Sequence, residues 1–356
     1  MTVAIIGTGW GARVQVPTFQ SAGLKVTALV GTDQAKTEQI ARNVGVPDAL
    51  SDWHSILTRD DIKLVSITTP PALHSEMAIA ALQAGKHVLC EKPAAFNITQ
   101  AQAMLTAAQA HAEQAALIDH ELRFLPALTL ARQMLTDGAI GDIRYVVSRL
   151  IDSRRSDPNR VWNWWSDAAS GGGLLGAAGS HQVDLLRYLL NAEVISVSAA
   201  LNTFITKRPN GEALQAVTSD DAYSLRLRFT NKTFASLEGN ATTQTNEPDS
   251  ITFYGTQGTL RWSDGHLYHA AAGQPFADIT PPHTYTLPAG LNGAYSHASV
   301  YLGHALRAFL DGDNAAIATG ATFADGLHVQ TVLDAVHLSH EQRGITIELA
   351  QSEPQA

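Results

Sequence analysis

A run of small residues near the start of the chain has the spacing of a phosphate-binding turn. The run is Gly7-Thr8-Gly9-Trp10-Gly11-Ala12, and it directly follows the apolar segment 3–6. In the pattern G-x-G-x-x-[GA], the first glycine permits a tight turn, the second lets the backbone approach a pyrophosphate, and the last small residue permits close helix–strand packing. The amides that open the next helix would then face the phosphates. We therefore expect this run to bind a dinucleotide.

The end of the second predicted strand bears on which dinucleotide binds. NAD-specific sites commonly carry Asp or Glu there, because a carboxylate bridges the ribose hydroxyls and repels a 2′-phosphate. This chain has Gly31 at that position, followed by Thr32 and, one helical turn further on, by Lys36. Space, a hydroxyl and a cation favour NADP over NAD. In the alternative, Asp33 holds the ribose and restores a preference for NAD, and Lys36 is a solvated helix residue.

The first third of the chain alternates short apolar runs with longer segments of helical spacing. Such alternation predicts a parallel sheet whose strands are buried on both faces. The predicted strands are 3–6, 26–30, 64–67, 87–90 and 116–118, and the predicted helices are 14–22, 34–43, 75–84 and 99–111. Gly23, Gly45 and Gly85 stand where helix C-caps belong. We expect residues 1–120 to form a Rossmann-type domain of the α/β class.

After residue 120 the pattern changes to that of an α+β domain, which we expect to span residues 121–356. Several alternating strands with turn residues between them predict a mostly antiparallel sheet with helices on one face. The predicted strands are 143–150, 223–229, 233–239, 251–254 and 259–262, and the predicted helices are 126–137, 174–190, 298–311 and 323–342. The polar tail 351–356 is expected to fray.

Length and composition narrow the class of protein. A chain of 356 residues exceeds what one core usually serves, which agrees with two domains. With 24 Lys and Arg against 33 Asp and Glu, a nucleic-acid partner is disfavoured. The start of the chain leaves no room for a signal peptide, no apolar run approaches the roughly 20 residues of a membrane span, and Cys90 is the single cysteine. We expect a cytoplasmic protein with no membrane partner.

Two further segments follow the glycine motif in an informative order. They are Thr68-Thr69-Pro70-Pro71-Ala72-Leu73-His74 and Ala84-Gly85-Lys86-His87-Val88-Leu89-Cys90-Glu91-Lys92-Pro93. With them, the chain resembles the Gfo/Idh/MocA oxidoreductases. Further matching segments are Arg123-Phe124-Leu125-Pro126, Gly138-Ala139-Ile140-Gly141, Gly171-Gly172-Gly173 and Gly179-Ser180-His181. The resemblance spans nearly the whole chain, and its most specific element is Glu91-Lys92-Pro93 at the end of a strand.

The resemblance implies an NAD(P)-dependent oxidoreductase whose substrates are sugars, inositols or related polyols. It implies an open C-terminal sheet that flanks the active-site cleft on one side and often mediates homodimer or homotetramer formation on the other. In this scheme Thr69, Pro70 and His74 line the cofactor. Glu91 and Lys92 lie near the nicotinamide ribose, and Lys92 also reaches the reacting substrate oxygen.

Lys92 and His181 are the candidate catalytic residues. Hydride transfer to or from a carbinol carbon needs a group that exchanges the hydroxyl proton. An ammonium at the carboxyl end of a parallel strand polarises a carbonyl, and an imidazole exchanges protons near neutrality. His181 also matches the position of the family's catalytic histidine.

The helix that carries His181 departs from the family pattern. The family usually has Asp-x-x-x-His there, but this chain has Ala177 in the place of the aspartate. Three outcomes are open: His181 acts alone, Asp184 or Glu121 compensates, or the activity is weak or lost. For Asp184, a local pair with Arg187 is the simpler interpretation. A cofactor-binding regulator, or the NAD-dependent glycosidase mechanism known in the family, remain as alternative functions.

Aromatic and basic residues near the glycine triplet are candidate substrate contacts. Trp162 and Trp165, with Trp164 between them, either stack on a sugar ring or pack in the core. Arg123 is a further candidate for a substrate or active-site contact. Arg154, Arg155 and Arg160 in the same loop hint at an anionic substrate, although loop arginines are often merely solvated.

A metal site is not predicted. His337, His340 and Glu341 share one predicted helix, but their spacing lacks the face and the third ligand of known zinc motifs. Cys90 has no neighbouring base in the sequence, and we interpret it as a packing residue.

Overall fold

The computed structural model describes residues 2–350, and contacts divide the chain into two compact units. The first unit consists of Met1–Leu125 and His283–Leu327, and the second of Pro126–Pro282 and His328–Ala356. The sequence predicted a single boundary near residue 120. The structure instead returns the chain to the first unit at His283. The tail 351–356, which was predicted to fray, lies outside the described residues.

The first unit is built on a seven-stranded sheet in the order β17-β6-β5-β4-β1-β2-β3. The strands from β6 to β3 run parallel, and β17 is antiparallel to β6. Their bounds are β1 (Thr2–Ile6), β2 (Lys25–Val30), β3 (Asp48–Leu50), β4 (Ile62–Ile67), β5 (His87–Cys90), β6 (Ala116–Ile118) and β17 (Ala321–Thr322). The strand order reverses between β1 and β4, which is the point where open parallel sheets bind ligands. The predicted parallel sheet is thus confirmed, although β3 and β17 were not predicted.

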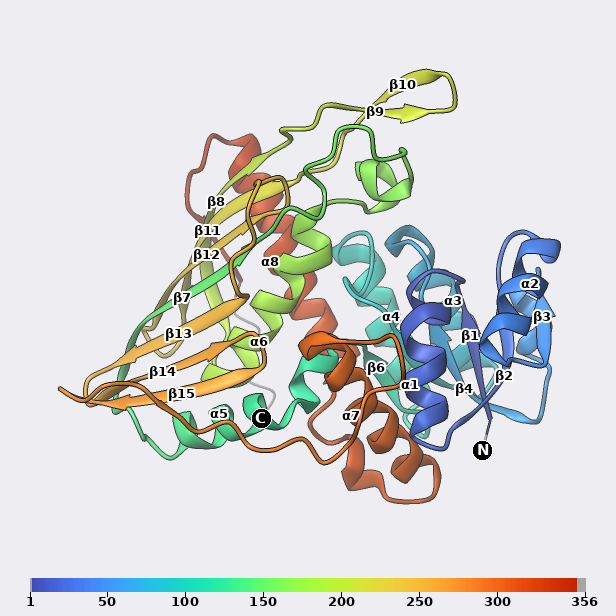
Figure 1. The fold of residues 1–356 in the computed structure, drawn as a ribbon, viewed down its shortest axis with the longest axis horizontal. Helices are drawn as coiled ribbons and strands as arrows, with labels where there is room; N and C mark the ends of the chain where they lie inside the picture. Colours follow the sequence, from blue (N-terminus) through green and yellow to red (C-terminus); the bar gives the residue numbers. More distant parts are fainter. Residues whose placement is uncertain (1, 351–356) are drawn as a thin grey trace. The chain divides into compact units, whose positions relative to one another are not determined.

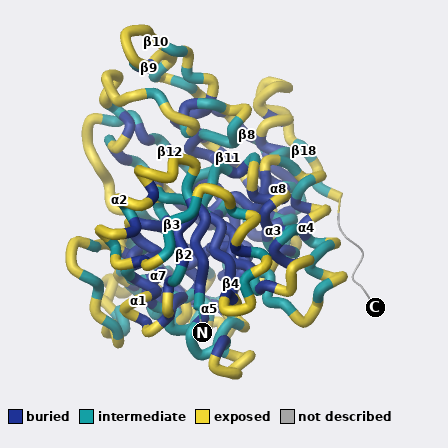
Figure 2. The backbone as a smooth tube through the Cα atoms, turned by 90° about the vertical axis from the view of Figure 1, so that its right-hand side faces the viewer, coloured by how far each residue is buried: buried dark blue, intermediate teal, exposed yellow. Residues whose placement is uncertain are grey.

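Helices cover both faces of this sheet (Figure 1). They are α1 (Val16–Ser21), α2 (Gln34–Val44), α3 (His74–Gln83), α4 (Ile98–Ala110) and α7 (Gly293–Leu310), with short turns η1 (Gly11–Gln15), η2 (Trp53–Ile56), η3 (Pro71–Leu73), η4 (Glu121–Phe124) and η8 (Asn314–Ile317). One core includes Ala78 and Met104 from α3 and α4, and the other includes Phe19 and Leu306 from α1 and α7. The strands between them are buried (Figure 2), as their apolar runs predicted.

Helix α7 belongs to the first unit because its apolar face packs on α1. Leu302, Leu306 and Leu310 recur at one-turn intervals and join the core that contains α1. Across this contact, Thr18 Oγ1 and Ser299 Oγ lie 2.9 Å apart. Helical spacing alone does not say which sheet a helix covers, so the sequence placed this helix with the second domain.

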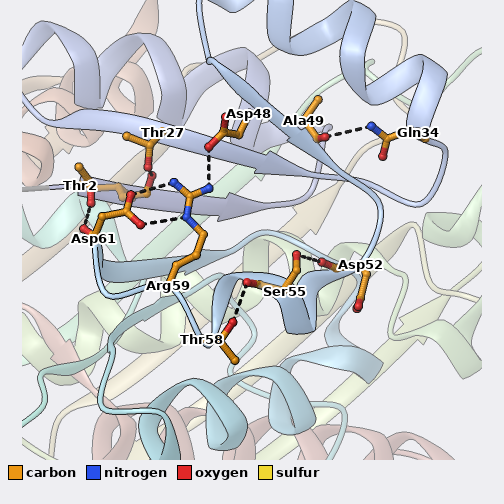
Figure 3. A network of polar contacts seen from close by, with 11 residues as sticks. Thr2, Thr27, Gln34, Asp48, Ala49, Asp52, Ser55, Thr58, Arg59 and Asp61 are labelled. Carbon is orange, nitrogen blue, oxygen red and sulfur yellow. Dashed lines mark hydrogen bonds and ion pairs between the residues drawn. The ribbon is translucent and has the colours of Figure 1, made fainter.

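At the edge of the first sheet, Arg59 binds two aspartates, Asp48 and Asp61 (Figure 3). Its Nη1 lies 2.6 Å from Asp48 of β3, and its Nε and Nη2 donate to Asp61 at 2.9 and 2.8 Å. All three side chains are partly exposed, so solvent screens both ion pairs and they contribute little to stability. The main effect is geometric, because the short strand β3 is tied to the turn that precedes β4.

The second unit contains a nine-stranded sheet in the order β16-β15-β14-β13-β7-β12-β11-β8-β18. Neighbouring strands are antiparallel except β12 and β7, which are parallel. The bounds are β7 (Ile143–Ile151), β8 (Val194–Asn202), β11 (Ala222–Phe229), β12 (Phe234–Asn240), β13 (Ser250–Gly255), β14 (Gly258–Ser263), β15 (His266–Ala271), β16 (Ala277–Asp278) and β18 (Ile347–Glu348), with a separate hairpin of β9 (Lys207–Asn210) and β10 (Ala213–Ala216). The predicted, mostly antiparallel sheet is confirmed.

Three helices lie along one face of this second sheet (Figure 1). They are α5 (Pro126–Thr136), α6 (Ser180–Leu190) and, from His328 onward, α8 (Phe323–Glu341). The loop between β7 and α6 contains the short turns η5 (Trp164–Ser166), η6 (Ala168–Ser170) and η7 (Leu175–Gly179). Within residues 2–350, no helix has both the length and the apolar character needed to cross a membrane.

Candidate active site

The glycine motif forms the turn that follows β1, at the reversal point of the first sheet. Gly7 has a φ of +121°, and a Cβ on it would lie 2.6 Å from the Thr68 carbonyl oxygen. A Cβ on Gly9 would meet nothing within 4 Å. The neighbouring loop therefore closes the turn at Gly7, whereas the backbone at Gly9 is open to a ligand. This arrangement fits the pyrophosphate of a dinucleotide.

Close approach of the following helical turn to β1 depends on Gly11. A Cβ on Gly11 would lie 2.6 Å from Ile5 Cγ2 and 2.6 Å from Thr68 Oγ1. The sequence assigned this packing to Ala12, which is 1% exposed and belongs to the core. Both small residues are used, but the tightest approach is at Gly11. Thr8 and Trp10 are partly exposed in the same turn, and their contact with the cofactor stays a prediction.

The end of β2 is closed to a large side chain. A Cβ on Gly31 would lie 2.8 Å from Thr8 Cγ2 and still closer to Thr37 Oγ1. An aspartate at this position would displace one of those threonines. Thr32, the next residue, and Lys36, in the first turn of α2, are both exposed.

Asp33 serves as the N-cap of α2. Its Oδ1 accepts a hydrogen bond from the Lys36 backbone nitrogen at 3.0 Å, and Thr37 Oγ1 donates to the Asp33 carbonyl at 2.6 Å. A side-chain cap of this kind stabilises a helix by about 1 kcal/mol. If Asp33 also held a ribose, one carboxylate would serve both the cap and the cofactor.

His74 joins the loops that follow β4 and β5. Its ring is fully buried, with Nε2 at 2.8 Å from the Thr69 carbonyl and Nδ1 at 3.0 Å from the Pro93 carbonyl. Burial lowers the pKa of His74 below its ordinary value, against the opposing effect of these carbonyls. Both ring nitrogens face the protein, so His74 positions Thr69 and its neighbour Pro70. Direct contact of these residues with a cofactor stays a prediction.

Glu91 and Lys92 stand at the carboxyl end of β5. The Glu91 nitrogen donates to the Ile67 carbonyl at 2.9 Å, which aligns this segment with the end of β4. Glu91 is buried, Lys92 is partly exposed, and the Lys92–Pro93 peptide is cis. The structure therefore places Lys92 at the edge of the sheet where ligands bind in this architecture.

A buried polar network lies next to Lys92, and sequence reasoning missed it. Gln15 Nε2 donates to Asp119 Oδ2 at 2.7 Å and approaches Glu91 Oε1 at 3.4 Å. Ser66 Oγ donates to Gln15 Oε1 at 2.6 Å. The four residues come from η1, β4 and the ends of β5 and β6, so the network ties the glycine motif to the neighbouring strands.

Burial makes both carboxyl groups of this network harder to ionise than ordinary carboxyl groups. Burial, and then the charge of Asp119, raises the pKa of Glu91 well above its ordinary value. Burial also raises the pKa of Asp119, although its hydrogen bonds with Glu91 and Gln15 oppose this. Two adjacent buried carboxylates repel each other, which disfavours a state in which both are ionised. The only sequence signal for this pair was the position of both residues at strand ends.

Arg123 and Glu121 are buried in η4 of the first unit. Arg123 is 5% exposed, and its Nη2 lies 3.1 Å from Asp325 Oδ1. This ion pair gives the guanidinium a structural partner. A substrate contact for Arg123 and a compensating role for Glu121 both stay predictions.

In the second unit, His181 lies at the start of α6 and is 3% exposed. The next residue, Gln182, fixes the helix to the sheet, because Nε2 donates to Ser148 Oγ at 2.8 Å and Oε1 accepts from Tyr223 at 2.6 Å. Ala177 lies in the wide turn η7 just before α6, with its nitrogen 3.2 Å from the Gly173 carbonyl.

Asp184 is fully buried in α6, one turn after His181. Arg187 forms a bidentate pair with Glu193, with both distances at 2.7 Å, and its predicted local pair with Asp184 stays a prediction. The compensating role of Asp184 stays a prediction.

The glycine triplet lets two segments meet closely. A Cβ on Gly172 would lie 2.7 Å from the Trp164 carbonyl oxygen and nearer still to that of Trp165. Gly173 has a φ of +125° and lies against the carboxyl group of Asp220. That carboxyl group also accepts from the Leu175 nitrogen at 2.7 Å, and burial raises its pKa to about 7.

The tryptophans of the loop differ in their surroundings. Trp162 is partly buried, and its Nε1 donates to the Ala216 carbonyl at 3.0 Å. Trp164 is 41% exposed. The Trp165 ring lies under the guanidinium of Arg155, 3.6 Å from its carbon to the ring centroid. Among the described side chains, no group of three or more His, Cys, Asp or Glu residues could hold a metal ion.

Comparison with known proteins agrees with both units. Residues 1–118 match the oxidoreductase family with an NAD-binding Rossmann fold, and residues 128–261 match the Gfo/Idh/MocA C-terminal domain. The chain belongs to the Gfo/Idh/MocA oxidoreductase family. This confirms the resemblance noted in the sequence.

Individual relatives cover most of the chain. An uncharacterized oxidoreductase of Synechocystis sp. is 30% identical over 81% of this chain and 81% of its own length. Glucose-fructose oxidoreductase domain-containing protein 2 of Bos taurus is 28% identical, over 99% of this chain and 95% of its own.

Among solved structures, an oxidoreductase domain protein from Kribbella flavida has a TM-score of 0.86 at 29% identity, over 98% of this chain and 99% of that chain. A levoglucosan dehydrogenase in complex with NADH and levoglucosan has a TM-score of 0.88 at 27% identity, over 99% of this chain and 100% of that chain.

Proposed function

We propose that this Gfo/Idh/MocA protein is an NADP-preferring dehydrogenase that moves a hydride between the nicotinamide and a secondary hydroxyl or ketone of a sugar-like or polyol substrate. The observation that carries the proposal is the open backbone at Gly9 together with Lys92 at the same carboxyl edge of the sheet. A bound nicotinamide supplies the hydride or accepts it. Support for the substrate class comes from the levoglucosan dehydrogenase relative.

In this proposal, each of three groups has a separate task. The turn from Gly7 to Ala12 binds the pyrophosphate, and Thr32 and Lys36 receive the 2′-phosphate. Lys92 holds and polarises the reacting substrate oxygen through its ammonium group. His181 exchanges the hydroxyl proton through its imidazole, which suits transfer near neutrality.

The buried pair next to Lys92 supports the proposed orientation role. We also propose that Glu91 is protonated and that Asp119 carries the charge, because burial and the charge of Asp119 raise the pKa of Glu91 well above its ordinary value; the pair is then an anion near the strand end that presents Lys92. Gln15 holds that anion in place from the glycine-motif side. The same network thus links the cofactor turn to the candidate catalytic lysine.

The test uses purified protein with NADPH or NADH and a panel of keto-sugars, and the reverse direction with NADP⁺ or NAD⁺ and levoglucosan, inositols and aldoses. Absorbance at the nicotinamide band should change at a rate at least about a hundredfold above that of Lys92→Ala, the contribution expected from one acid–base group. His181→Asn should cause a loss of similar size. If no substrate changes the absorbance above the Lys92→Ala background, the proposal is wrong.

Ala177 favours one alternative function, a regulator that binds the cofactor without turnover. A methyl group cannot fix the tautomer of His181 as the family's aspartate would. Cofactor binding with no reaction on the whole panel would support this alternative. Release of an aglycone from glycosides without net absorbance change would instead support the glycosidase alternative.

We also propose that the protein assembles as a homodimer or homotetramer through the sheet face opposite α5 and α6. Support comes from a row of aromatic rings across β12, β7 and β13, in which Tyr145 stacks on Phe234 at 5.4 Å and on Tyr254 at 6.1 Å. Tyr254 is 40% exposed. Light scattering should give a dimer or tetramer mass, and Tyr254→Glu should lower it. A monomer mass for the unaltered protein would contradict the assembly.

A further inference from the structure

Arg155 is a buried arginine, and one nitrogen of its guanidinium has no hydrogen-bond partner among the described residues. The described residues include four buried arginines: Arg123, Arg155, Arg187 and Arg208. Arg123 pairs with Asp325, Arg187 pairs with Glu193, and Arg208 donates to two backbone carbonyls at 2.7 and 2.8 Å. Arg155 is 7% exposed, and within residues 2–350 its buried Nη2 has no hydrogen-bond partner. A buried guanidinium nitrogen without an acceptor is costly, which indicates an acceptor from outside the chain.

Three aspartates close to Arg155 in the sequence or in space have other partners. Asp152 forms a 2.6 Å ion pair with Arg154. The carboxylate of Asp221 accepts hydrogen bonds from the backbone nitrogens of Phe204 and Ile205 at 2.8 and 2.9 Å. Asp220 caps the Leu175 nitrogen, as described above. Asp221 stabilises the charge of Arg155 only through its field.

Positive charge accumulates around Arg155. Burial, and then the charges of Arg160 and Arg208, together lower the pKa of Arg155 to about 9. Burial and Arg160 also lower the pKa of Arg208, which Asp221 and Asp157 oppose. The guanidinium nevertheless remains charged at neutral pH. An oxyanion would relieve the repulsion among the three arginines.

The surroundings hold the guanidinium in one orientation. Its planar face lies on Trp165, whose carbonyl accepts from Ser219 at 2.9 Å. The Arg155 nitrogen donates to the Ala241 carbonyl at 2.8 Å, and its own carbonyl accepts from Arg208. With its face covered by an indole, the guanidinium can recognise a ligand only through its N–H edge, and the flat fork of arginine suits carboxylate and phosphate oxygens.

We propose that Arg155, supported by Arg160 and Arg208, binds an anionic group, a carboxylate or a phosphate, carried by a sugar-like ligand. This inference rests on the proposed function for the sugar-like part of the ligand, and it goes further by making that ligand acidic. Trp165 orients Arg155, and Trp162 anchors the same loop to the β9–β10 hairpin.

The test compares three ligands with the same ring: D-glucose, D-glucuronate and D-glucose 6-phosphate. Binding is measured by calorimetry with the full chain, without any requirement for turnover. At least one acidic sugar should bind tenfold or more tightly than D-glucose, and the comparison of the two shows whether carboxylate or phosphate is preferred. Arg155→Gln should remove that advantage, and Arg155→Lys should restore only part of it.

Two further variants keep the proposal testable if Arg155→Gln does not fold. Arg160 is exposed, so Arg160→Gln should fold and should weaken binding of the acidic sugar about threefold. Arg42 is a matched control, since it is exposed and only 3.9 Å from Glu38, and Arg42→Gln should change nothing. The inference is overturned if neither acidic sugar binds more tightly than D-glucose, or if Arg160→Gln or a folded Arg155→Gln retains the full advantage.

The same samples separate this inference from the proposed function. NAD(P)H binding and oxidation are recorded alongside the calorimetry. Arg155-dependent anion binding without hydride transfer would contradict only the proposed dehydrogenase. Turnover of neutral sugars with no preference for acidic ones would contradict only the anion site.

Discussion

Gln15 and Asp119 are joined by a 2.7 Å hydrogen bond from Nε2 to Oδ2, which links the helical turn after the glycine motif to the end of β6. Gln15→Leu removes the donor and leaves a buried carboxylate without this partner. The free energy of unfolding should fall by about 2 kcal/mol, the cost typical for a hydrogen bond to a charged group. Urea denaturation measures it. Gln20→Leu, at an exposed residue of α1, should change stability by less than about 0.5 kcal/mol, and an equal effect in both variants would contradict the role of Gln15.

Glu91→Gln tests the assignment of the shared proton. The folded-state pKa of Glu91 is raised, so the folded protein binds more protons than the unfolded chain above about pH 4.3, and stability falls as pH rises from there. A glutamine amide donates to Asp119 as the protonated acid does. Glu91→Gln should therefore keep the fold and lose part of this pH dependence.

The measurement for Glu91→Gln is urea denaturation at a series of pH values from 4.5 to 8. Glu113→Gln is the control, because Glu113 is exposed in the turn after α4. A Glu91→Gln protein with the slope of the wild type, or with much lower stability at pH 8, would show that Glu91 is ionised in the fold.

Lys36→Gln tests the preference for a 2′-phosphate. Lys36 is exposed in the first turn of α2, and an acidic side chain has no room at Gly31, at the end of β2. Affinity for NADPH should fall about fivefold to tenfold, as expected for loss of one partly solvated charge contact, and affinity for NADH should stay within twofold. Fluorescence titration of the reduced cofactors measures both, with exposed Lys25→Gln as the control. An equal loss of affinity for NADPH and NADH would show that Lys36 does not determine which cofactor is preferred.

The periodicity of the sequence was sufficient to predict the sheets and most helices. A strand that is buried on both faces has a continuous apolar run, whereas a strand that is buried on one face alternates apolar and polar residues. It was not sufficient for β3, a three-residue edge strand that is only half buried. The periodicity also did not assign α7 to a unit. Leu302, Leu306 and Leu310 form an apolar face, but their spacing does not show which helix or sheet that face packs on.

The site was predictable where short motifs carry the chemistry, as at Gly7 to Ala12 and at Lys92. The network of Gln15, Ser66, Glu91 and Asp119 was not, because its members are far apart in sequence and Gln15 has no distinguishing pattern in its helix. Arg155 was grouped with Arg154 and Arg160 as one loop cluster. Arg155 differs from its neighbours in its burial and in the missing hydrogen-bond partner of its Nη2, and neither feature can be read from the sequence.

Asp220→Asn gives a second, independent pH signature. Burial raises the pKa of Asp220 to about 7, some three units above the ordinary value for aspartate, so the wild type loses up to about 4 kcal/mol of stability as pH rises from 4 to 7. Asparagine still accepts from the Leu175 nitrogen but carries no charge. The variant should therefore be flatter than the wild type between pH 4.5 and 7.5 in urea denaturation. Exposed Asp137→Asn should keep the wild-type slope. Since Asp220 and Glu91 have different partners, the double variant with Glu91→Gln should lose both contributions additively, and an unchanged slope in Asp220→Asn would mean that Asp220 is ionised throughout this range.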